Sequence, residues 1–345
     1  MPETTPSRPW IETPLLESKS LSKLNGCRVF QKLENLQPSK SFKTRGIGNL
    51  IVQSIKADPS RTPHFYISSG GNAGLACVTA SSTLGYKSTV VVPQLIKPFM
   101  VTKLETAGAE VIQHGATWFE CDQYLRNELL DKDPNGVYIP PFDHPEIWQG
   151  ASSMVEEWER QLAVIDGVAP LQGQKNGQSE ERIAADAVVC SVGGGGLFCG
   201  IMKGLESKQN KTKVVTVETI GCDSLYQSVE KGELVTLPGI TSIATSLGAT
   251  RVAPQALQYT TENKDTVKSL TVTDKQAVEA LLKFASEENM IVEPACGATL
   301  APAYEGRLKE IIPDLKEDSR VILVVCGGSV VNLELLDEWR RTYGS

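Results

Sequence analysis

The chain has 345 residues, of which 41% are apolar, with 34 basic and 41 acidic side chains. A net charge of −7 leaves no broad basic face, which argues against nucleic acid and anionic membranes as partners. No uncharged apolar run approaches the roughly 18 residues of a membrane-spanning helix, and residues 1–6 lack the pattern of a signal or transit peptide. We expect a cytoplasmic protein, with a mitochondrial location left open.

Short β-branched runs alternate with longer helical patterns along most of the chain. The predicted strands cover 28–33, 64–67, 88–92, 110–113, 137–140, 187–192, 213–218 and 321–326. The predicted helices cover 71–84, 98–107, 117–131, 151–163, 222–231, 274–289 and 298–312. Several strands are apolar throughout, as strands buried on both faces are. The alternation predicts an α/β fold with two open, twisted, mostly parallel sheets wrapped by helices.

The strands group into two regions of the chain. Four of them lie within 46–148, which is enough for a compact subdomain. We therefore expect a small domain of residues 46–148 and a large domain formed by residues 1–45 together with 149–345. The segment 165–185 is polar and contains glycines through its middle, which predicts a surface loop between a helix and the next strand.

The first candidate for chemistry is Lys43, in the run Ser-Lys-Ser-Phe-Lys-Thr-Arg-Gly at 39–46. Exposed lysines usually serve solubility, and the neighbouring Lys40 and Arg45 favour that ordinary interpretation. The following Gly-Ile-Gly stretch, however, is unsuited to a purely surface helix. A lysine beside other cations or in a desolvated pocket loses its proton more readily and becomes a nucleophile. Lys43 is therefore a candidate amine for bonding an aldehyde.

The next motif is Ser-Ser-Gly-Gly-Asn-Ala-Gly at 68–74, which follows one predicted strand and opens a helix. Its hydroxyls, its glycine amides and the Asn72 side chain would converge where the helix dipole favours anions, so a carboxylate or a phenolate oxygen would fit. An ordinary capped turn explains the same residues, because Ser and Asn are common helix caps.

A run of four glycines, 193–196, separates an apolar strand from a predicted helix start. A glycine turn at a helix N-terminus presents free N–H groups and the positive end of the dipole, which suits a phosphate. The rival interpretation is a dinucleotide fingerprint, with Glu218 as the acid on the next strand. That fingerprint is broken, because a phenylalanine or a cysteine stands where its third glycine belongs. It remains a minor alternative.

Cys326 ends the last predicted strand, at the carboxyl edge where open α/β sheets bind ligands. A thiol there could contact a heteroaromatic nitrogen, although a buried small residue explains it equally well. The chain has eight cysteines without a C-x-x-C pair, and its three histidines lack ligand spacing. These patterns favour free buried thiols and argue against structural zinc.

Six motifs in this order resemble those of the fold type II pyridoxal phosphate enzymes, and most closely those of the serine/threonine dehydratases. The motifs occupy 41–46, 68–74, 138–143, 191–197, 292–298 and 325–329, so the resemblance runs nearly end to end. A cysteine at 326 points to the serine dehydratase branch, because serine racemases of this fold are expected to carry serine there. Gly70 departs from some dehydratases, which carry alanine at that position.

The resemblance implies a set of ligands and a role for each motif. Pyridoxal 5'-phosphate would be held covalently by Lys43, with Phe42 flanking the ring and Asn72 bonding its oxygen. The remaining cofactor contacts would be Gly193, Gly194, Gly195, Gly196, Leu197 and Cys326. The substrate carboxylate would lie on Ser69, Gly70 and Asn72. A monovalent cation, potassium, would lie at Glu218 with the carbonyls near Gly193, Cys222, Leu247 and Ala249.

The expected activity is that of an L-serine ammonia-lyase, which forms pyruvate and ammonia from L-serine and 2-oxobutyrate from L-threonine. The resemblance also implies a homodimer. Three alternatives remain open at this point: a serine racemase of the same fold, a dinucleotide-dependent oxidoreductase that the broken fingerprint disfavours, and a non-enzymatic amino-acid sensor that uses the same pocket.

Overall fold

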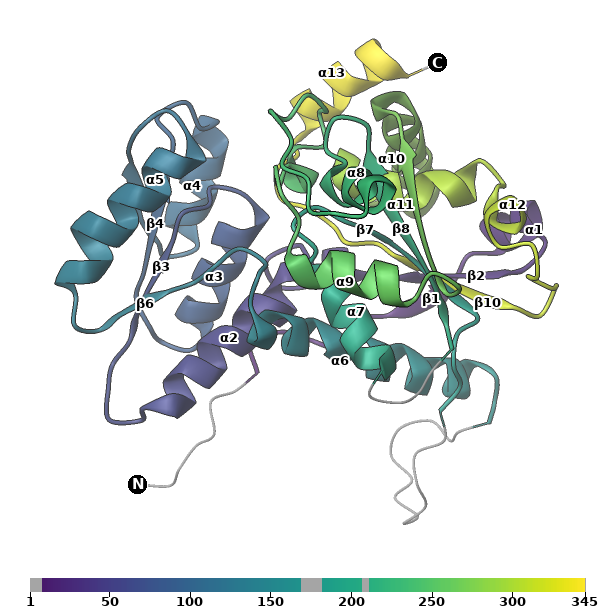
Figure 1. Ribbon diagram of the computed structural model, residues 1–345, viewed down its shortest axis with the longest axis horizontal. Coiled ribbons are helices and arrows are strands. Elements are labelled where there is room, and N and C mark those ends of the chain that lie inside the picture. The colour runs from purple at the N-terminus through teal and green to yellow at the C-terminus, as the bar shows by residue number, and fades with distance from the viewer. Residues whose placement is uncertain (1–7, 169–181, 207–210, 345) are drawn as a thin grey trace.

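The computed structural model describes residues 8–168, 182–206 and 211–344, and within them the chain forms two separate sheets. Figure 1 shows these sheets in two lobes, which meet along the helices α2 (Lys43–Ala57) and α6 (Pro145–Ile165). Along the sequence, the chain therefore forms two strands of the larger sheet, then the whole smaller sheet, and then the remaining strands of the larger sheet.

The larger sheet has six strands in the order β1-β2-β10-β7-β8-β9. These strands are Leu15–Glu17 (β1), Arg28–Lys32 (β2), Ala187–Ser191 (β7), Lys213–Thr219 (β8), Val267–Val272 (β9) and Arg320–Val324 (β10). The edge strand β1 runs antiparallel to β2, and the other ladders are parallel. The central strands are buried on both faces, which explains why they read as continuous apolar runs.

The smaller sheet has four parallel strands in the order β5-β4-β3-β6. They are His64–Ile67 (β3), Ser88–Val92 (β4), Glu110–Gln113 (β5) and Gly136–Tyr138 (β6). Apolar residues of α2, α3 (Asn72–Thr83) and α4 (Pro98–Thr106) form the core on one face of this sheet. On the other face, α5 (Trp118–Tyr124) and the turn after it pack against Tyr66 and Val91.

Helices cover both faces of the larger sheet as well. Figure 1 shows α6 and α7 (Gly196–Glu206) on one side, and α10 (Asp274–Glu288) and α11 (Pro294–Tyr304) on the other. The remaining helices are α1 (Lys19–Asn25), α8 (Ser224–Lys231), α9 (Pro254–Glu262), α12 (Leu308–Ile311) and α13 (Leu333–Tyr343). Among the helices that the structure describes, none is long and apolar enough to cross a membrane.

This architecture confirms the predicted fold class, and each predicted strand is present with ends within two residues of those expected. The sequence patterns missed the edge strands β1 and β9 and the helices α1, α2, α9 and α13. The helix expected over 117–131 consists of α5, a π-helical turn over Leu125–Leu129 and a 3-10 turn. The helix expected over 298–312 begins earlier, at Pro294, and is two helices. Most of the loop expected over 165–185 lies outside the described residues.

Candidate active site

The candidate site lies where several strands of both sheets end at their carboxyl edges. Gly193–Gly196 follow β7, Cys326 follows β10, and Ser68–Gly71 follow β3 in the smaller sheet. Ligands of open α/β sheets bind at such edges, because the loops there converge above the strands. One pocket unites all the predicted cofactor contacts, and its lining includes Phe42, Lys43, Asn72, Gly193, Gly194, Gly195, Gly196, Leu197 and Cys326.

Lys43 begins helix α2, and the segment before it is tied to the end of the large sheet. The Phe42 N–H donates to the Cys326 carbonyl at 3.1 Å, and Ser41 pairs with Gly327. The Lys43 Nζ donates to the Pro141 carbonyl at 2.9 Å and lies 5.6 Å from the centre of the Phe42 ring. Desolvation lowers the pKa of Lys43 to about 8. The amine is therefore close to losing its proton at neutral pH, as a nucleophilic lysine must.

The backbone of the glycine run lies in close contact with neighbouring residues, and these positions have no room for a side chain. Gly195 has a φ of +93°, which L side chains rarely adopt. A Cβ on Gly194 would lie 2.2 Å from the Phe142 ring. Because Gly196 is the first residue of α7, the loop presents N–H groups that have no acceptor within the helix. The loop therefore has the chemistry of a phosphate cradle, as its sequence predicts.

Asn72, the first residue of α3, makes three hydrogen bonds that fix its amide group. Its Oδ1 accepts from the Ser329 N–H at 2.7 Å. Its Nδ2 donates to the Glu293 Oε1 at 2.7 Å and to the Ser246 hydroxyl at 3.2 Å. Glu293 is a functional candidate that the sequence reasoning missed, although its Val-Glu-Pro motif was noted. The signal was an acidic residue directly before the proline that starts an apolar helix.

Cys326 is buried beside two other small polar side chains. Its Sγ lies 3.6 Å from the Ser191 hydroxyl. Hydrogen bonding with Cys296, and then burial, raise the pKa of Cys326 well above its usual value, so the thiol stays neutral. A neutral thiol at this position can contact a ring nitrogen but cannot keep it protonated as a carboxylate would.

Two predicted substrate contacts, Ser69 and Gly70, are absent from the lining of this pocket. The structure also shows what lies beside Gly70: a Cβ there would meet the Ile96 Cδ1 at 2.2 Å. The space freed by the glycine is therefore occupied by Ile96. The role of Ser69 and Gly70 in binding the substrate carboxylate stays a prediction.

The predicted cation ligands come from three segments: the end of β8 with the turn before α8, the glycine run, and the 3-10 turn that ends at Leu247 with the residues after it. The Glu218 carboxylate is fully buried and accepts from the N–H groups of Leu225 and Tyr226, at 3.0 and 2.6 Å. Burial raises the pKa of Glu218 to about 8. A Cβ on Gly193 would lie 2.9 Å from the Leu247 Cα, so these two expected ligands are neighbours. Cys222 is fully buried, and the Ala249 N–H donates to the Leu247 carbonyl at 2.8 Å. The cation site stays a prediction.

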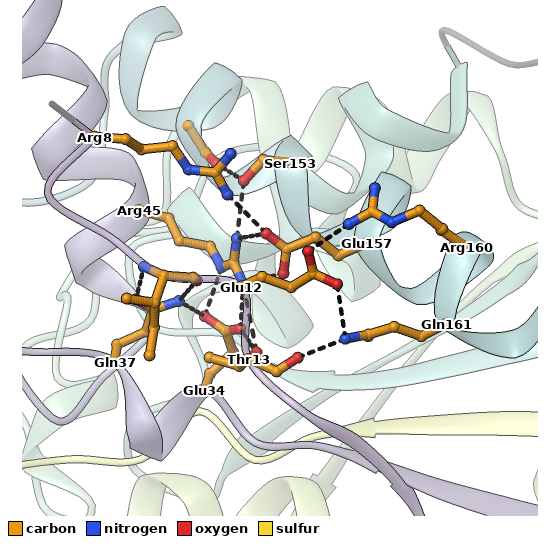
Figure 2. A network of polar contacts seen from close by, with 12 residues as sticks. Arg8, Glu12, Thr13, Glu34, Gln37, Arg45, Ser153, Glu157, Arg160 and Gln161 are labelled. Carbon is orange, nitrogen blue, oxygen red and sulfur yellow. Dashed lines mark hydrogen bonds and ion pairs between the residues drawn. The ribbon is translucent and has the colours of Figure 1, made fainter. Parts of the chain in front are cut away.

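A buried network of charges lies directly behind Lys43, and Figure 2 shows it around Arg45. The Arg45 guanidinium donates to both carboxylate oxygens of Glu34, at 2.7 and 2.8 Å, and to both of Glu157, at 2.7 and 2.5 Å. The Lys32 ammonium donates to Glu157 at 3.0 Å. The side chains of Arg45, Lys32 and Glu34 are fully inaccessible. Arg45, which the sequence suggested to be a surface cation, is thus part of the core.

The residues of the pocket fit pyridoxal phosphate. Such a cofactor needs an amine for its aldehyde, donors for its phosphate, a partner for its ring oxygen and one for its ring nitrogen. Lys43 supplies an amine with a lowered pKa, and the glycine run supplies backbone donors. The Nδ2 of Asn72 supplies an N–H, and Cys326 supplies a neutral thiol. These groups surround one cavity.

Comparison with known proteins agrees with this chemistry. The model of the family described as pyridoxal-phosphate dependent enzyme matches residues 7–327. The chain belongs to this family. An L-serine dehydratase of Saccharomyces cerevisiae is 42% identical over 94% of both chains. An L-serine dehydratase/L-threonine deaminase of Bos taurus is 39% identical over 97% of this chain and 96% of its own.

A solved structure is similar to this chain over almost its whole length. A fungal L-serine ammonia-lyase from Rhizomucor miehei superposes with a TM-score of 0.85 at 33% identity, and the match covers 97% of this chain and 99% of that one. Membership of the family removes the dinucleotide alternative. The structure gives a physical reason as well, because the Glu218 oxygens already accept from the backbone of α8.

Proposed function

We propose that this chain is an ammonia-lyase that converts L-serine to pyruvate and ammonia, and L-threonine to 2-oxobutyrate and ammonia. The observation that carries the proposal is the meeting of Lys43, the glycine run and a neutral Cys326 thiol in one pocket. The substrates are those named for the relatives from yeast and cattle, which match nearly the whole chain.

The cofactor, when bound, would supply an electron-withdrawing ring that acidifies the substrate Cα–H, so that the electron pair left at Cα can form the Cα–Cβ double bond as the β-hydroxyl departs. The glycine run and the Leu197 N–H would hold its phosphate, and Phe42 would flank its ring. The Nδ2 of Asn72 has two hydrogens, so it can keep its 2.7 Å contact with Glu293 and exchange its longer 3.2 Å bond to Ser246 for one to a ring oxygen.

Lys43 performs the proton transfer in this proposal. Once it is free of its covalent bond to the cofactor, its neutral Nζ takes the proton from the substrate Cα. Its pKa of about 8 suits this task, because a general base works best when its pKa is near the operating pH. Ser69, Gly70 and Asn72 would hold the substrate carboxylate, so that the Cα–H bond is oriented toward Nζ.

The test uses the purified protein loaded with pyridoxal phosphate. The visible absorption spectrum would report covalent loading, and 2-oxo acid would be assayed with L-serine, L-threonine and D-serine. The proposal predicts 2-oxo acid from the two L-amino acids. Loading without 2-oxo acid from either would contradict it. Conversion of L-serine mainly to D-serine would favour the racemase alternative instead.

We further propose that a monovalent cation, potassium, binds at Glu218 with the carbonyls near Gly193, Cys222, Leu247 and Ala249. The close approach of Gly193 and Leu247 supports the proposal, because a cation bound between their carbonyls would stabilise the glycine run that would hold the cofactor phosphate. Rates in potassium should exceed rates in a bulky organic cation, and Glu218→Gln should remove the difference. Equal rates in both salts would contradict it.

The remaining proposals concern organisation. We propose a small domain of residues 46–148, a large domain of 1–45 with 149–345, a homodimer, and a cytoplasmic location. Both domain boundaries fall inside helices, at the starts of α2 and α6. The sedimentation of the purified protein would test the dimer, which predicts twice the mass of one chain.

A further inference from the structure

Glu293 is a buried acid in the pocket that the proposed reaction does not use. It directly precedes helix α11, is 4% exposed, and lines the same pocket as Lys43. Burial raises its pKa to about 7, against the opposing effects of Ser246, Asn72, the Val330 amide and Lys43. An acid in such surroundings is a candidate for function, provided that its contacts have a purpose.

The contact with Asn72 has a defined direction. The Ser329 N–H can only donate, so the atom of Asn72 that faces it must be the oxygen. The amide nitrogen must then face Glu293, which accepts at 2.7 Å. A carboxylate at this place therefore favours the orientation in which Asn72 presents N–H groups to the pocket. With the amide reversed, two oxygens would face each other.

The backbone beside Glu293 is shaped to admit the carboxyl group. A Cβ on Gly328 would lie 2.0 Å from the Glu293 Cδ, and Gly328 has a φ of +133°. The Oε2 atom is buried and makes no well-formed hydrogen bond, whereas Oε1 is bonded to Asn72. One oxygen is thus committed to Asn72, and the other lies beside the backbone at Gly328.

The charged and titratable groups near Glu293 come from three other elements. They are Lys43 at the start of α2, Lys103 on α4, and Cys326 after β10. The negative charge of Glu293 acts to raise the pKa of each of them. Of these groups, Lys43 is the amine of the site, so the charge of Glu293 bears directly on how readily that amine is deprotonated.

We propose that Glu293 is a positioning residue, which fixes the Asn72 side chain with its nitrogen toward the cofactor and serves as the counter-charge of Lys43. Its hydrogen bond ties the Asn72 amide, at the start of α3 on the small-sheet side, to the start of α11 on the large-sheet side of the pocket. This inference rests on the proposed use of pyridoxal phosphate, and it deepens that proposal by naming the group that keeps the site ready for the cofactor.

The first experiment measures the lysine in the cofactor-free protein. An uncharged amine-labelling reagent would be applied over a range of pH, and labelling of Lys43 would be followed by peptide mapping. Glu293→Gln keeps the shape and an acceptor oxygen but removes the charge. It should shift the midpoint of labelling to lower pH, because loss of a nearby anion favours the neutral amine. The surface variant Glu262→Gln on α9 is the matched control and should leave the midpoint unchanged. An unshifted midpoint in Glu293→Gln would overturn the counter-charge role.

The second experiment measures cofactor affinity with a double-mutant cycle. Glu293→Ala and Asn72→Ala should each weaken pyridoxal phosphate binding about tenfold or more, as expected for the loss of a hydrogen bond to a charged group. The double variant should bind no more weakly than Asn72→Ala alone, because Glu293 acts through Asn72. Additive losses would overturn the positioning role, and Glu293→Asp should recover part of the affinity.

These readouts are separate from the proposed reaction. Lysine labelling needs no turnover, so a wild-type protein that binds the cofactor but forms no 2-oxo acid would refute the ammonia-lyase activity and leave the role of Glu293 testable. Folded Glu293 variants with the wild-type circular dichroism spectrum would refute the role of Glu293 alone if Glu293→Gln labels like the wild type and Glu293→Ala binds the cofactor like the wild type.

Discussion

Two buried polar clusters lie back to back in this protein, and they differ in how completely their charges are paired. Around Arg45, the guanidinium bonds both oxygens of two buried carboxylates (Figure 2). Two residues earlier, Lys43 donates to one carbonyl, and its pKa falls to about 8. The start of one helix thus holds a cation that is fixed and a cation that can lose its proton. Complete pairing serves the fold, and incomplete pairing leaves a group available for chemistry.

The comparison predicts opposite effects of removing the two cations, and Lys43 gives the largest effect on activity. Lys43→Met should lower 2-oxo acid formation by a factor on the order of 10³ or more, because the base and the covalent attachment are both lost. In the wild type, activity should rise with pH through about 8 as the amine loses its proton. A pH–rate profile and a turnover assay check both expectations.

The same variant should not weaken the fold. The folded state lowers the pKa of Lys43 from 10.5 to about 8, so holding the proton below pH 8 costs the folded state free energy. The cofactor-free Lys43→Met protein should therefore melt above the wild type at pH 7. The difference should shrink as the pH rises from 8 toward 10.5. A lower melting temperature at pH 7 would contradict this account.

Arg45→Met should give the largest loss of stability. It would leave Glu34 and Glu157 buried without their shared partner, and breaking a buried pair in this way typically costs about 3–5 kcal/mol. The matched control is Arg126→Met, because the side chain of Arg126 is 48% exposed and its pair with Asp122 should contribute about 0–1 kcal/mol. Urea unfolding of the two variants checks the difference. Equal losses would show that burial does not distinguish the two arginines.

Cys326 offers a way to add a charge to the incompletely paired cluster. Cys326→Ser keeps a neutral group and should retain much of the dehydratase activity. Cys326→Asp should lower it about tenfold or more, because a carboxylate would keep the ring nitrogen protonated and would lie near the buried Glu293. The rate of 2-oxo acid formation and the rate of inactivation by transamination would be compared. Wild-type behaviour of the aspartate variant would show that Cys326 is only a core residue.

Gly70→Ala should have the smallest effect. In the structure the added methyl group would point at the flexible end of Ile96. The ratio of serine to threonine efficiencies should therefore change by less than the roughly tenfold that a methyl group can cause inside a substrate pocket. Ile96→Ala combined with Gly70→Ala should remove any residual effect. A larger change would place Gly70 against the substrate after all.

Several strands were predictable because they are buried on both faces and read as apolar runs, as β4 and β7 do. The edge strands β1 and β9 were missed because they are partly exposed. A strand such as Val267–Val272 carries Lys, Ser and Thr and therefore does not read as an apolar run. Helix α2 was missed because of its two glycines. Gly46 packs against Ile147, and a Cβ there would lie 2.7 Å from that residue's backbone oxygen, so tertiary contact overrides the helix propensity of glycine.

The candidate site was predictable as far as its motifs carry chemistry in adjacent residues. The partners Glu34, Glu157 and Glu293 were not, because each meets its cation or amide across 11 to 221 positions of sequence. Nothing in the run Lys-Thr-Arg-Gly distinguishes an arginine that is 0% exposed from one on the surface. Long-range pairing of charges follows from the fold and not from local sequence.

The crossing of α2 and α6 has a mechanical consequence. A Cβ on Gly150 would lie 2.3 Å from the Arg45 carbonyl, so the two helix backbones touch there, two residues from Lys43. A rotation of one lobe relative to the other that preserves this contact would turn about it. The Lys43 amine would then lie close to the rotation axis and move little. Asn72, at the start of α3 in the smaller lobe, lies farther from that axis and would be displaced more. The lobes could open and close around a substrate while the reacting nitrogen keeps its place.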